Sequence, residues 1–317
     1  MSSSIGIGIH GGCGTPDVSQ LSAADWAEAR THLADSLRAA WRILSKGGPA
    51  LDAVEAAVVV MEESPQFNAG TGAALNAEGY HELDASIMDG RTLEAGAVCA
   101  VQRIRNPVRA ARAVLERSSS VLIAGAAADE FAASVGLEIV PNSHFTTERR
   151  VAALASLKRR GKDGTIKLAT EAERHGTVGA VALDVTGNLA AATSTGGFNN
   201  KPVGRIGDTP IVGAGTYAKN GVCAVSCTGQ GEIFIRRVAA YDAAARMGYA
   251  GQTLVQATDE LIRNLGSHGI GAGLVAIDAN GQVVAPFNTL GMFRGWVTAA
   301  GEVVVATHKD EVRMGAA

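Results

Sequence analysis

The sequence predicts an α/β protein in which many strands pair antiparallel. Short apolar runs alternate with longer stretches of helical spacing, which is typical of strands and helices packed in layers. Turns at 186–188 and 278–282 join apolar runs and contain Asn and Gly, as β-hairpins require. Glycine is abundant, at 39 of 317 residues, and suits tight turns and close backbone approaches. The 47% hydrophobic content is enough for one large domain or two ordinary ones.

The first half of the chain is expected to mix strands and helices. Ser22 and Asp25 give a partial capping box for a helix that ends at Gly47-Gly48, and Pro49 starts the next helix. This second helix is expected to end near residue 63. The other expected elements are a strand over 5–9, strands over 80–88 and 96–102, a helix over 107–117, and a further strand and short helix to about 133.

Composition changes between residues 143 and 176. The stretch is charged and polar, with the run Lys158-Arg159-Arg160-Gly161-Lys162, and has little to bury. We expect an exposed, mobile linker with one helical turn around 148–158. The basic run would suit nucleic acid, but no aromatic residues are interleaved with its charges, so a solvated linker is favoured.

The second half is expected to be richer in strands. Two hairpins are predicted, one from strands over 178–185 and 189–195 and the other from strands over 274–277 and 283–286. Between them, a strand over 221–227 leads into a helix ending near Gly248, and another helix covers about 251–265.

The overall charge and cysteine usage exclude several classes of protein. Lys and Arg number 28 against 31 Asp and Glu, a net charge of -3, so we expect neither a nucleic-acid partner nor a membrane surface. No apolar run reaches the ~20 residues that span a bilayer, and the N-terminus lacks a basic signal-peptide region, so a cytoplasmic location is expected. The four cysteines show no CxxC pairing and are expected to be buried thiols; Cys223 and Cys227 share one face of a strand.

Familiar catalytic and nucleotide motifs are absent from the sequence. The string Gly6-x-Gly8-x-x-Gly11 matches the dinucleotide fingerprint, but that fingerprint needs a helix immediately afterwards. Here the helix begins only near residue 22, so a strand ending in a glycine turn explains the segment better. The seven histidines are scattered, and no Gly-x-Ser-x-Gly, His-Glu-x-x-His or Walker sequence occurs. We therefore expect no cofactor.

Thr177 stands where the polar linker meets a buried strand. A threonine starts many strands, so its position alone has no functional meaning. If the bond between Gly176 and Thr177 were cut, however, one residue would carry both a hydroxyl and a free α-amine with a pKa of about 7.7–8.0. That amine can accept the hydroxyl proton without a separate histidine. Gly176 also tolerates the strained backbone that self-cleavage needs.

Two glycine-rich loops follow Thr177. In Gly204-Arg205-Ile206-Gly207-Asp208, the arginine offers a fork for a carboxylate and the aspartate accepts from an ammonium; the alternative is a local surface ion pair. In Thr228-Gly229-Gln230-Gly231, backbone N–H groups at a helix N-terminus suit an oxyanion; the alternative is a tight strand–helix turn.

Together these motifs resemble the isoaspartyl peptidase/plant-type asparaginase family of N-terminal nucleophile hydrolases. The matches occur in family order over nearly the whole chain, apart from the linker and the C-terminal tail. They are His10-Gly11-Gly12, Phe67-Asn68-Ala69-Gly70-x-Gly72, Glu82-Leu83-Asp84-Ala85, Met88-Asp89-Gly90, the segments 175–182 and 187–197, Gly204-Arg205-x-Gly207-Asp208 and Thr228-Gly229-x-Gly231-Glu232.

The resemblance implies a four-layer αββα sandwich made as a precursor. Cleavage between Gly176 and Thr177 would give an α subunit (1–176) and a β subunit (177–317), which form one structural domain and assemble as (αβ)2. Small-molecule substrates, asparagine and β-aspartyl dipeptides, would be hydrolysed to aspartate plus ammonia or an amino acid. The implied site consists of Thr177 as nucleophile, Thr195 positioning it, Arg205 on the substrate carboxylate, Asp208 on its ammonium, Thr228 and Gly229 as oxyanion hole, Gly231 in the same substrate-binding turn, and Asn68 near the new amine.

The resemblance further implies a structural sodium ion held by backbone carbonyls. Its loop would contain Met61, Glu62, Ser64, Phe67, Ala69 and Thr71. Two other functions remain open at this point. A glycosylasparaginase-like amidase would use the same nucleophile, and an unprocessed homologue would keep the amino-acid clamp and only bind.

Overall fold

The computed structural model describes residues 5–14, 21–159 and 176–317, and they form a mixed α/β fold. A nine-stranded sheet has the order β13-β12-β11-β1-β5-β6-β2-β3-β4, and a four-stranded sheet has the order β10-β9-β8-β7. The predicted α/β class is therefore confirmed. The strands of the large sheet are β1 (Gly6–Cys13), β2 (Leu83–Asp89), β3 (Ala95–Val101), β4 (Leu122–Ala124), β5 (Val178–Leu183), β6 (Leu189–Thr195), β11 (Met292–Val297), β12 (Glu302–Ala306) and β13 (Glu311–Ala316); those of the small sheet are β7 (Thr216–Lys219), β8 (Cys223–Gly229), β9 (Ala272–Asp278) and β10 (Val283–Val284).

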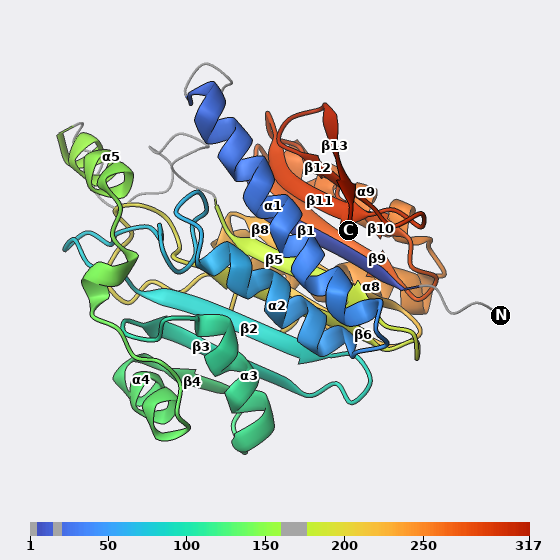
Figure 1. The fold of residues 1–317 in the computed structure, drawn as a ribbon, viewed down its shortest axis with the longest axis horizontal. Helices are drawn as coiled ribbons and strands as arrows, with labels where there is room; N and C mark the ends of the chain where they lie inside the picture. The colour runs from blue at the N-terminus through green and yellow to red at the C-terminus, as the bar shows by residue number, and fades with distance from the viewer. Residues whose placement is uncertain (1–4, 15–20, 160–175) are drawn as a thin grey trace.

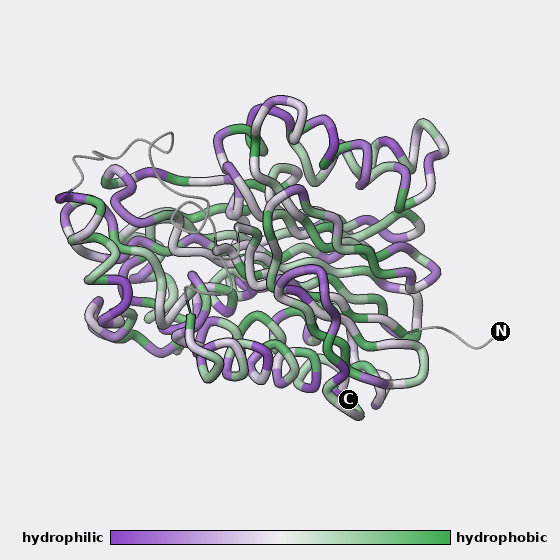
Figure 2. The backbone as a smooth tube through the Cα atoms, turned by 90° about the horizontal axis from the view of Figure 1, so that it is seen from above, coloured by the Kyte–Doolittle hydropathy of each residue, from purple (hydrophilic) through white to green (hydrophobic). Residues whose placement is uncertain are grey.

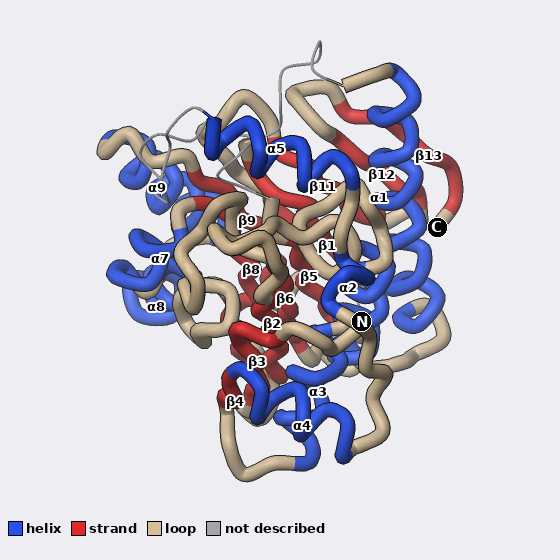
Figure 3. Tube along the Cα trace, turned by 90° about the vertical axis from the view of Figure 1, so that its left-hand side faces the viewer, coloured by secondary structure: helices blue, strands red, loops and turns tan. Residues whose placement is uncertain are grey.

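Helices cover the outer face of each sheet, and the two sheets pack against each other (Figures 1 and 3). On the large sheet lie α1 (Ala23–Leu44), α2 (Ala50–Glu62) and α3 (Pro107–Arg117), with α4 (Gly125–Ser134) beside β3 and β4; α7 (Gly231–Arg237), α8 (Ala239–Ala250) and α9 (Leu254–Ser267) lie on the side of the small sheet. A Cβ on Gly96 would overlap the Ala111 carbonyl, so glycine is required where α3 crosses β3.

Three apolar clusters fill the spaces between these elements, and the hydrophobic segments run through the interior in Figure 2. One lies between the large sheet and α1–α3 and includes Leu33, Val54 and Ile87. A second lies between the sheets and includes Val181 and Val275. The third lies between the small sheet and its helices, and both Cys223 and Cys227 belong to it, as their predicted common face requires. Burial of each large aliphatic side chain contributes about 1.5–3 kcal/mol.

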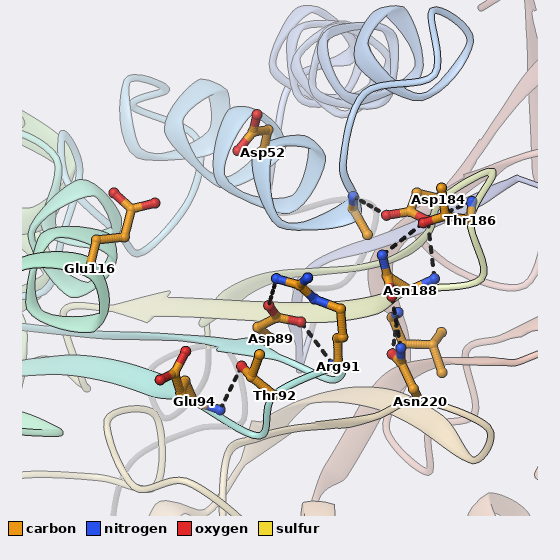
Figure 4. A network of polar contacts seen from close by, with 12 residues as sticks. Asp52, Asp89, Arg91, Thr92, Glu94, Glu116, Asp184, Thr186, Asn188 and Asn220 are labelled. Atoms are coloured by element: carbon orange, nitrogen blue, oxygen red, sulfur yellow. Dashed lines mark hydrogen bonds and ion pairs between the residues drawn. The ribbon is translucent and has the colours of Figure 1, made fainter.

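The β5–β6 hairpin forms at the predicted turn and is fixed by polar side chains (Figure 4). Asp184 Oδ1 accepts from the backbone N–H groups of Thr186 and Asn188, and from the Thr186 hydroxyl. Asp184 Oδ2 accepts from the N–H of Ala50, which ties the turn to the start of α2. Asn220 donates to Asn188 Oδ1 from the adjacent loop. These contacts set the register of β5, the strand that follows Thr177.

The α1 and α3 predictions are confirmed, including the capping box of Ser22 and Asp25. The linker prediction is wrong for its first half. A 3-10 turn at Asn142–Phe145 precedes α5 (Glu148–Arg159), a helix of 12 residues instead of one turn. Phe145, Leu154 and Leu157 are buried, and Arg150 donates to the Gly72 carbonyl, so this segment is docked. The remaining linker residues, 160–175, lie outside the described residues.

Two further differences concern the C-terminal half. The single helix expected to end near Gly248 is two helices, because Val238 adopts left-handed φ and ψ of 48° and 50° between α7 and α8. The turn lets the N–H groups of Ala240 and Tyr241 donate to the carbonyls of Ala214 and Gly213. Strands β11–β13 were not predicted; β11 pairs with β1 at the centre of the large sheet. None of the helices in the described ranges is long and apolar enough to cross a bilayer.

Candidate active site

Thr177 lies immediately before the first residue of β5, a central strand of the large sheet, as predicted. Its hydroxyl donates to Thr195 Oγ1 over 3.2 Å, and Thr195 Oγ1 also accepts from the Gly197 N–H. Gly176 has φ of 147°, a conformation that favours glycine. The structure therefore brings Thr177 and Thr195 together and places an unusual backbone conformation at the expected cleavage position.

Two segments pack tightly against Gly176. A Cβ on Gly176 would lie 2.7 Å from Asn68 Cβ, and a Cβ on Gly12 would lie 2.6 Å from Gly176 Cα. The Asn68 side chain is fixed on both sides, because its amide donates to the Gly197 carbonyl and its oxygen accepts from the Ala74 N–H. Asn68 thus lies beside the junction, as the resemblance implied, in a single amide orientation.

A narrow cavity of about 10 Å³ opens at Thr177. Its lining combines hydroxyl, cationic, carboxylate and glycine residues from both glycine-rich loops and from β6. They are Thr177, Thr195, Gly197, Phe198, Arg205, Gly207, Asp208, Thr209 and Gly229. Three of the expected site residues, Thr228, Gly231 and Asn68, do not line the cavity. Each is either next in sequence to a lining residue or packed against one.

Arg205 is held along one edge of its guanidinium. Nε donates to Glu232 Oε1 over 2.9 Å, and Cζ lies 4.9 Å above the Phe198 ring. Gly207 and Gly231 leave room for the other edge, because a Cβ there would lie 2.9 Å from Nη1 and 2.8 Å from Nη2, respectively. Among the described residues, the ion partner of Arg205 is Glu232 and not Asp208, so the alternative of a local Arg205–Asp208 ion pair is wrong. Within this part of the chain no hydrogen bond engages the two terminal nitrogens, which could therefore bind a carboxylate.

Asp208 is a buried carboxyl with a spare acceptor. Its side chain is 6% exposed, and Oδ2 has no hydrogen-bond partner among the described residues. Burial raises the pKa of Asp208 to about 7, although the nearby charge of Arg205 opposes the rise. A buried, unpartnered carboxylate oxygen is costly unless a cation pairs with it, so this position suits a ligand ammonium.

The Thr228–Gly231 turn connects β8 to α7. Gly229 lies on the cavity wall with φ of 155°. The Thr228 hydroxyl accepts from the Cys13 N–H over 3.3 Å and contacts Cys13 Sγ at 3.8 Å. Its proton is therefore not committed to a strong acceptor, because a thiol sulfur is a weak one. At the cavity this turn presents Gly229, and the Thr228 hydroxyl lies behind it against Cys13.

Sequence reasoning did not assign a role to several residues that support this site. Lys201 is fully buried and donates to the Glu82 carbonyl, while the Glu82 carboxylate accepts from the Gly204 N–H. These contacts hold the loop that carries Arg205. Burial lowers the pKa of Lys201, although the charges of Asp84 and Glu82 oppose this. Glu82 and Glu232 lie in motifs shared with the family, and that position could have indicated their role. Lys201 lies in no such motif.

The chain matches the family model described as asparaginase over residues 3–307. It is 45% identical over 309 residues to the isoaspartyl peptidase of Escherichia coli strain K12, covering 96% of each chain. It is 47% identical over 308 residues to the isoaspartyl peptidase of Salmonella typhimurium, covering 96% of this chain and 98% of the relative. The human isoaspartyl peptidase/L-asparaginase is 44% identical over 253 residues, covering 79% and 80% of the two chains.

Proposed function

The chain belongs to the asparaginase family and is a hydrolase of the isoaspartyl peptidase/L-asparaginase type, and we propose that Thr177 is its nucleophile. The proposed substrates are L-asparagine and β-aspartyl dipeptides, giving L-aspartate plus ammonia or an amino acid. One observation carries the assignment of the nucleophile. Thr177 lines the same small cavity as the open edge of Arg205 and the buried carboxyl of Asp208.

The nucleophile is activated by cleavage of its own backbone. Thr177 Oγ1 attacks the Gly176 carbonyl carbon, the peptide C–N bond breaks, and water hydrolyses the resulting ester. Subunits 1–176 and 177–317 result. The φ of Gly176 supports this step, because few other residues adopt such a backbone. The released α-amine, with an ordinary pKa of about 7.7–8.0, then accepts the Thr177 hydroxyl proton during turnover.

The substrate is held at both ends of its α-carbon. Arg205 binds the α-carboxylate through its terminal nitrogens, and Asp208 binds the α-ammonium. Thr177 Oγ1 attacks the side-chain carbonyl carbon, and the negative oxygen is stabilised by the Gly229 N–H and the Thr228 hydroxyl. The C–N bond breaks, the leaving amine takes the proton, and water hydrolyses the β-aspartyl ester. Thr195 orients the nucleophile through its 3.2 Å hydrogen bond.

Two structural proposals accompany the mechanism. The fold is assigned as an αββα sandwich of the N-terminal nucleophile hydrolase type, assembled as (αβ)2. A sodium ion bound by carbonyls of the 61–71 loop would hold that loop and Asn68 within it. The loop is tight enough for carbonyl ligation: Gly70 has φ of 50°, and a Cβ on Gly72 would lie 2.9 Å from the Phe67 oxygen.

Denaturing gels and ammonia release test the function on the full chain. The wild type is expected to give two bands, each near half of 32.4 kDa, and to release ammonia from L-asparagine. Thr177→Ala should stay as one band and be inactive, whereas Thr177→Ser keeps a hydroxyl and should retain cleavage. A wild type that stays whole and inactive would indicate the amino-acid-binding alternative. Turnover by Thr177→Ala would remove Thr177 as nucleophile.

A further inference from the structure

A row of buried polar side chains crosses the large sheet beside Thr177. His10 on β1 pairs in register with Gly179 on β5, Gly179 pairs with Thr193 on β6, and Thr193 pairs with Ser86 on β2. In the small sheet, Ser226 on β8 pairs with Thr216 on β7. The five polar residues of these two rows are all 0% exposed.

The two rows interlock into one chain of hydrogen bonds, which we call the hydroxyl ladder. It alternates between the sheets at every step, and no charged group takes part in it. The contacts are His10 Nε2–Ser226 Oγ at 2.9 Å, Ser226 Oγ–Thr193 Oγ1 at 2.7 Å, Thr193 Oγ1–Thr216 Oγ1 at 2.5 Å and Thr216 Oγ1–Ser86 Oγ at 2.8 Å.

Gly179 makes this crossing possible. It occupies the position between His10 and Thr193 in the large-sheet row, directly opposite Ser226. A Cβ on Gly179 would overlap Ser226 Oγ and lie 2.6 Å from His10 Nε2. The missing side chain is therefore the space into which Ser226 inserts, and only glycine permits the ladder to continue from β6 to β1.

Both ends of the ladder terminate on carbonyls of cavity residues. His10 Nδ1 lies 3.1 Å from the Thr177 carbonyl, and Ser86 Oγ lies 2.6 Å from the Thr209 carbonyl. Thr209 follows Asp208 in the chain and lines the cavity with it. One end of the ladder thus holds the backbone of the nucleophile, and the other end holds the backbone next to the amino-acid clamp.

From Thr216 to His10, the hydrogen bonds of the ladder all point in one direction. A carbonyl only accepts, so His10 Nδ1 must carry a proton, and burial lowers the pKa of His10 to about 3, which keeps the ring neutral. Nε2 then accepts from Ser226, Ser226 accepts from Thr193, and Thr193 accepts from Thr216. Ser226 and Thr193 each donate once and accept once, while Ser86 shares its single proton between Thr216 Oγ1 and the Thr209 carbonyl. Loss of the Thr193 hydroxyl therefore leaves one hydrogen-bonding site of Ser226 and one of Thr216 buried and unsatisfied.

We propose that the hydroxyl ladder positions the nucleophile relative to the amino-acid clamp, with His10 as the positioning residue at Thr177 and Thr193 as its central link. The inference rests on the proposed function and adds residues outside the cavity to it. It predicts that breaking the ladder at a distance from the substrate lowers kcat more than it changes KM, because substrate contacts stay in place while the attacking hydroxyl is displaced.

Thr193→Val and Thr193→Ser form the matched pair that tests the proposal. Valine keeps the shape and removes the hydroxyl, whereas serine keeps the hydroxyl. Thr193→Val is expected to lower kcat for L-asparagine by at least about tenfold with KM changed by less than about threefold, and Thr193→Ser to stay within about threefold of wild type in both. If Thr193→Val is also cut more slowly than Thr193→Ser on gels, that supports the same conclusion. Equal kcat in the two variants would overturn the proposal.

A second measurement tests the ladder on the wild-type protein, so it needs neither turnover nor a correctly folded variant. ¹⁵N NMR of the His10 ring in the wild type should show a protonated Nδ1 and an unprotonated Nε2. The opposite tautomer would refute the ladder's direction even if the enzyme is fully active. A wild type with the expected tautomer but without hydrolysis would instead leave the ladder in place and refute the proposed function.

Discussion

Protonation of Asp208 is expected to control substrate capture. Burial raises the pKa of this carboxyl to about 7, and Oδ2 has no partner in the described part of the chain. At a pH below 7 the free enzyme therefore holds Asp208 mainly as a neutral acid, which does not attract an ammonium. Because only the ionised form pairs with substrate, kcat/KM for L-asparagine should fall as the pH falls through about 7.

The magnitude follows from the number of groups that must be deprotonated. With a pKa of about 7, Asp208 is ionised in about a tenth of the molecules at pH 6 and about a hundredth at pH 5. The Thr177 amine, with a pKa of about 7.7–8.0, must also be neutral, and it adds a second tenfold loss per pH unit. Log kcat/KM should therefore approach a slope of about 2 at acidic pH. In the bound complex the ammonium keeps Asp208 ionised, so log kcat should keep a slope of about 1.

Asp208→Asn separates the two groups. The variant loses the titrating carboxyl, so its log kcat/KM should have an acid slope of about 1, and at pH 8 its kcat/KM should fall about 10–100-fold with the lost ion pair. Initial rates of ammonia release between pH 5 and 9 on cleaved enzyme measure both effects. Asp259→Asn, on an exposed position of α9, is the control and should match the wild type. A wild-type slope of 1, or equal slopes in wild type and Asp208→Asn, would refute this reasoning.

Three further predictions concern stability and the clamp. Burial raises the pKa of Glu62 to about 8, so the folded state binds this proton more tightly than the unfolded state does. The free energy of unfolding should therefore fall by roughly 4 kcal/mol as the pH rises from about 4.5 to 8. Glu62→Gln should remove most of this loss, which thermal melts at pH 5 and 8 measure. Arg205→Lys keeps the charge but loses the fork, so kcat/KM should fall about 10–100-fold; unchanged kinetics would exclude a bidentate contact. Gly179→Ala should cost about 1–3 kcal/mol in chemical denaturation, since its Cβ would overlap Ser226 Oγ; an unaltered midpoint would contradict the tight crossing.

The predictable parts of the fold are those specified locally. Asp25 lies three residues after Ser22, and this spacing forms the capping box of α1. The turn at 186–188 needs a positive φ, which Gly187 supplies at 84°. By contrast, Val238 adopts a left-handed conformation that its own side chain disfavours, and contacts with a loop more than twenty residues earlier stabilise it. No local pattern marks such a position.

The site was predictable as a set of residue types but not as a set of partners. Thr177, Arg205 and Asp208 were located from loop chemistry and family motifs, and they line one cavity. The ion partner of Arg205 was not predicted. The local alternative was Asp208, three residues away, whereas Glu232, 27 residues away, holds Nε. The hydroxyl ladder was not foreseen either. Period-2 patterns indicate which face a residue occupies, but the register between two packed sheets depends on packing that no single segment encodes.

In the proposed mechanism Thr177 serves two reactions, and its position at the start of β5 supports this role. β5 is paired on both sides, by β1 and β6, so the backbone after Thr177 is held whether or not the preceding bond is intact. His10 adds a direct hydrogen bond to the Thr177 carbonyl. On the other side of the bond, Gly12 and Asn68 pack so closely on Gly176 that a side chain there has no room. The fold therefore holds Thr177 from the side that would survive cleavage, which is the condition that the proposed mechanism sets for the same hydroxyl to attack first its own chain and then a substrate.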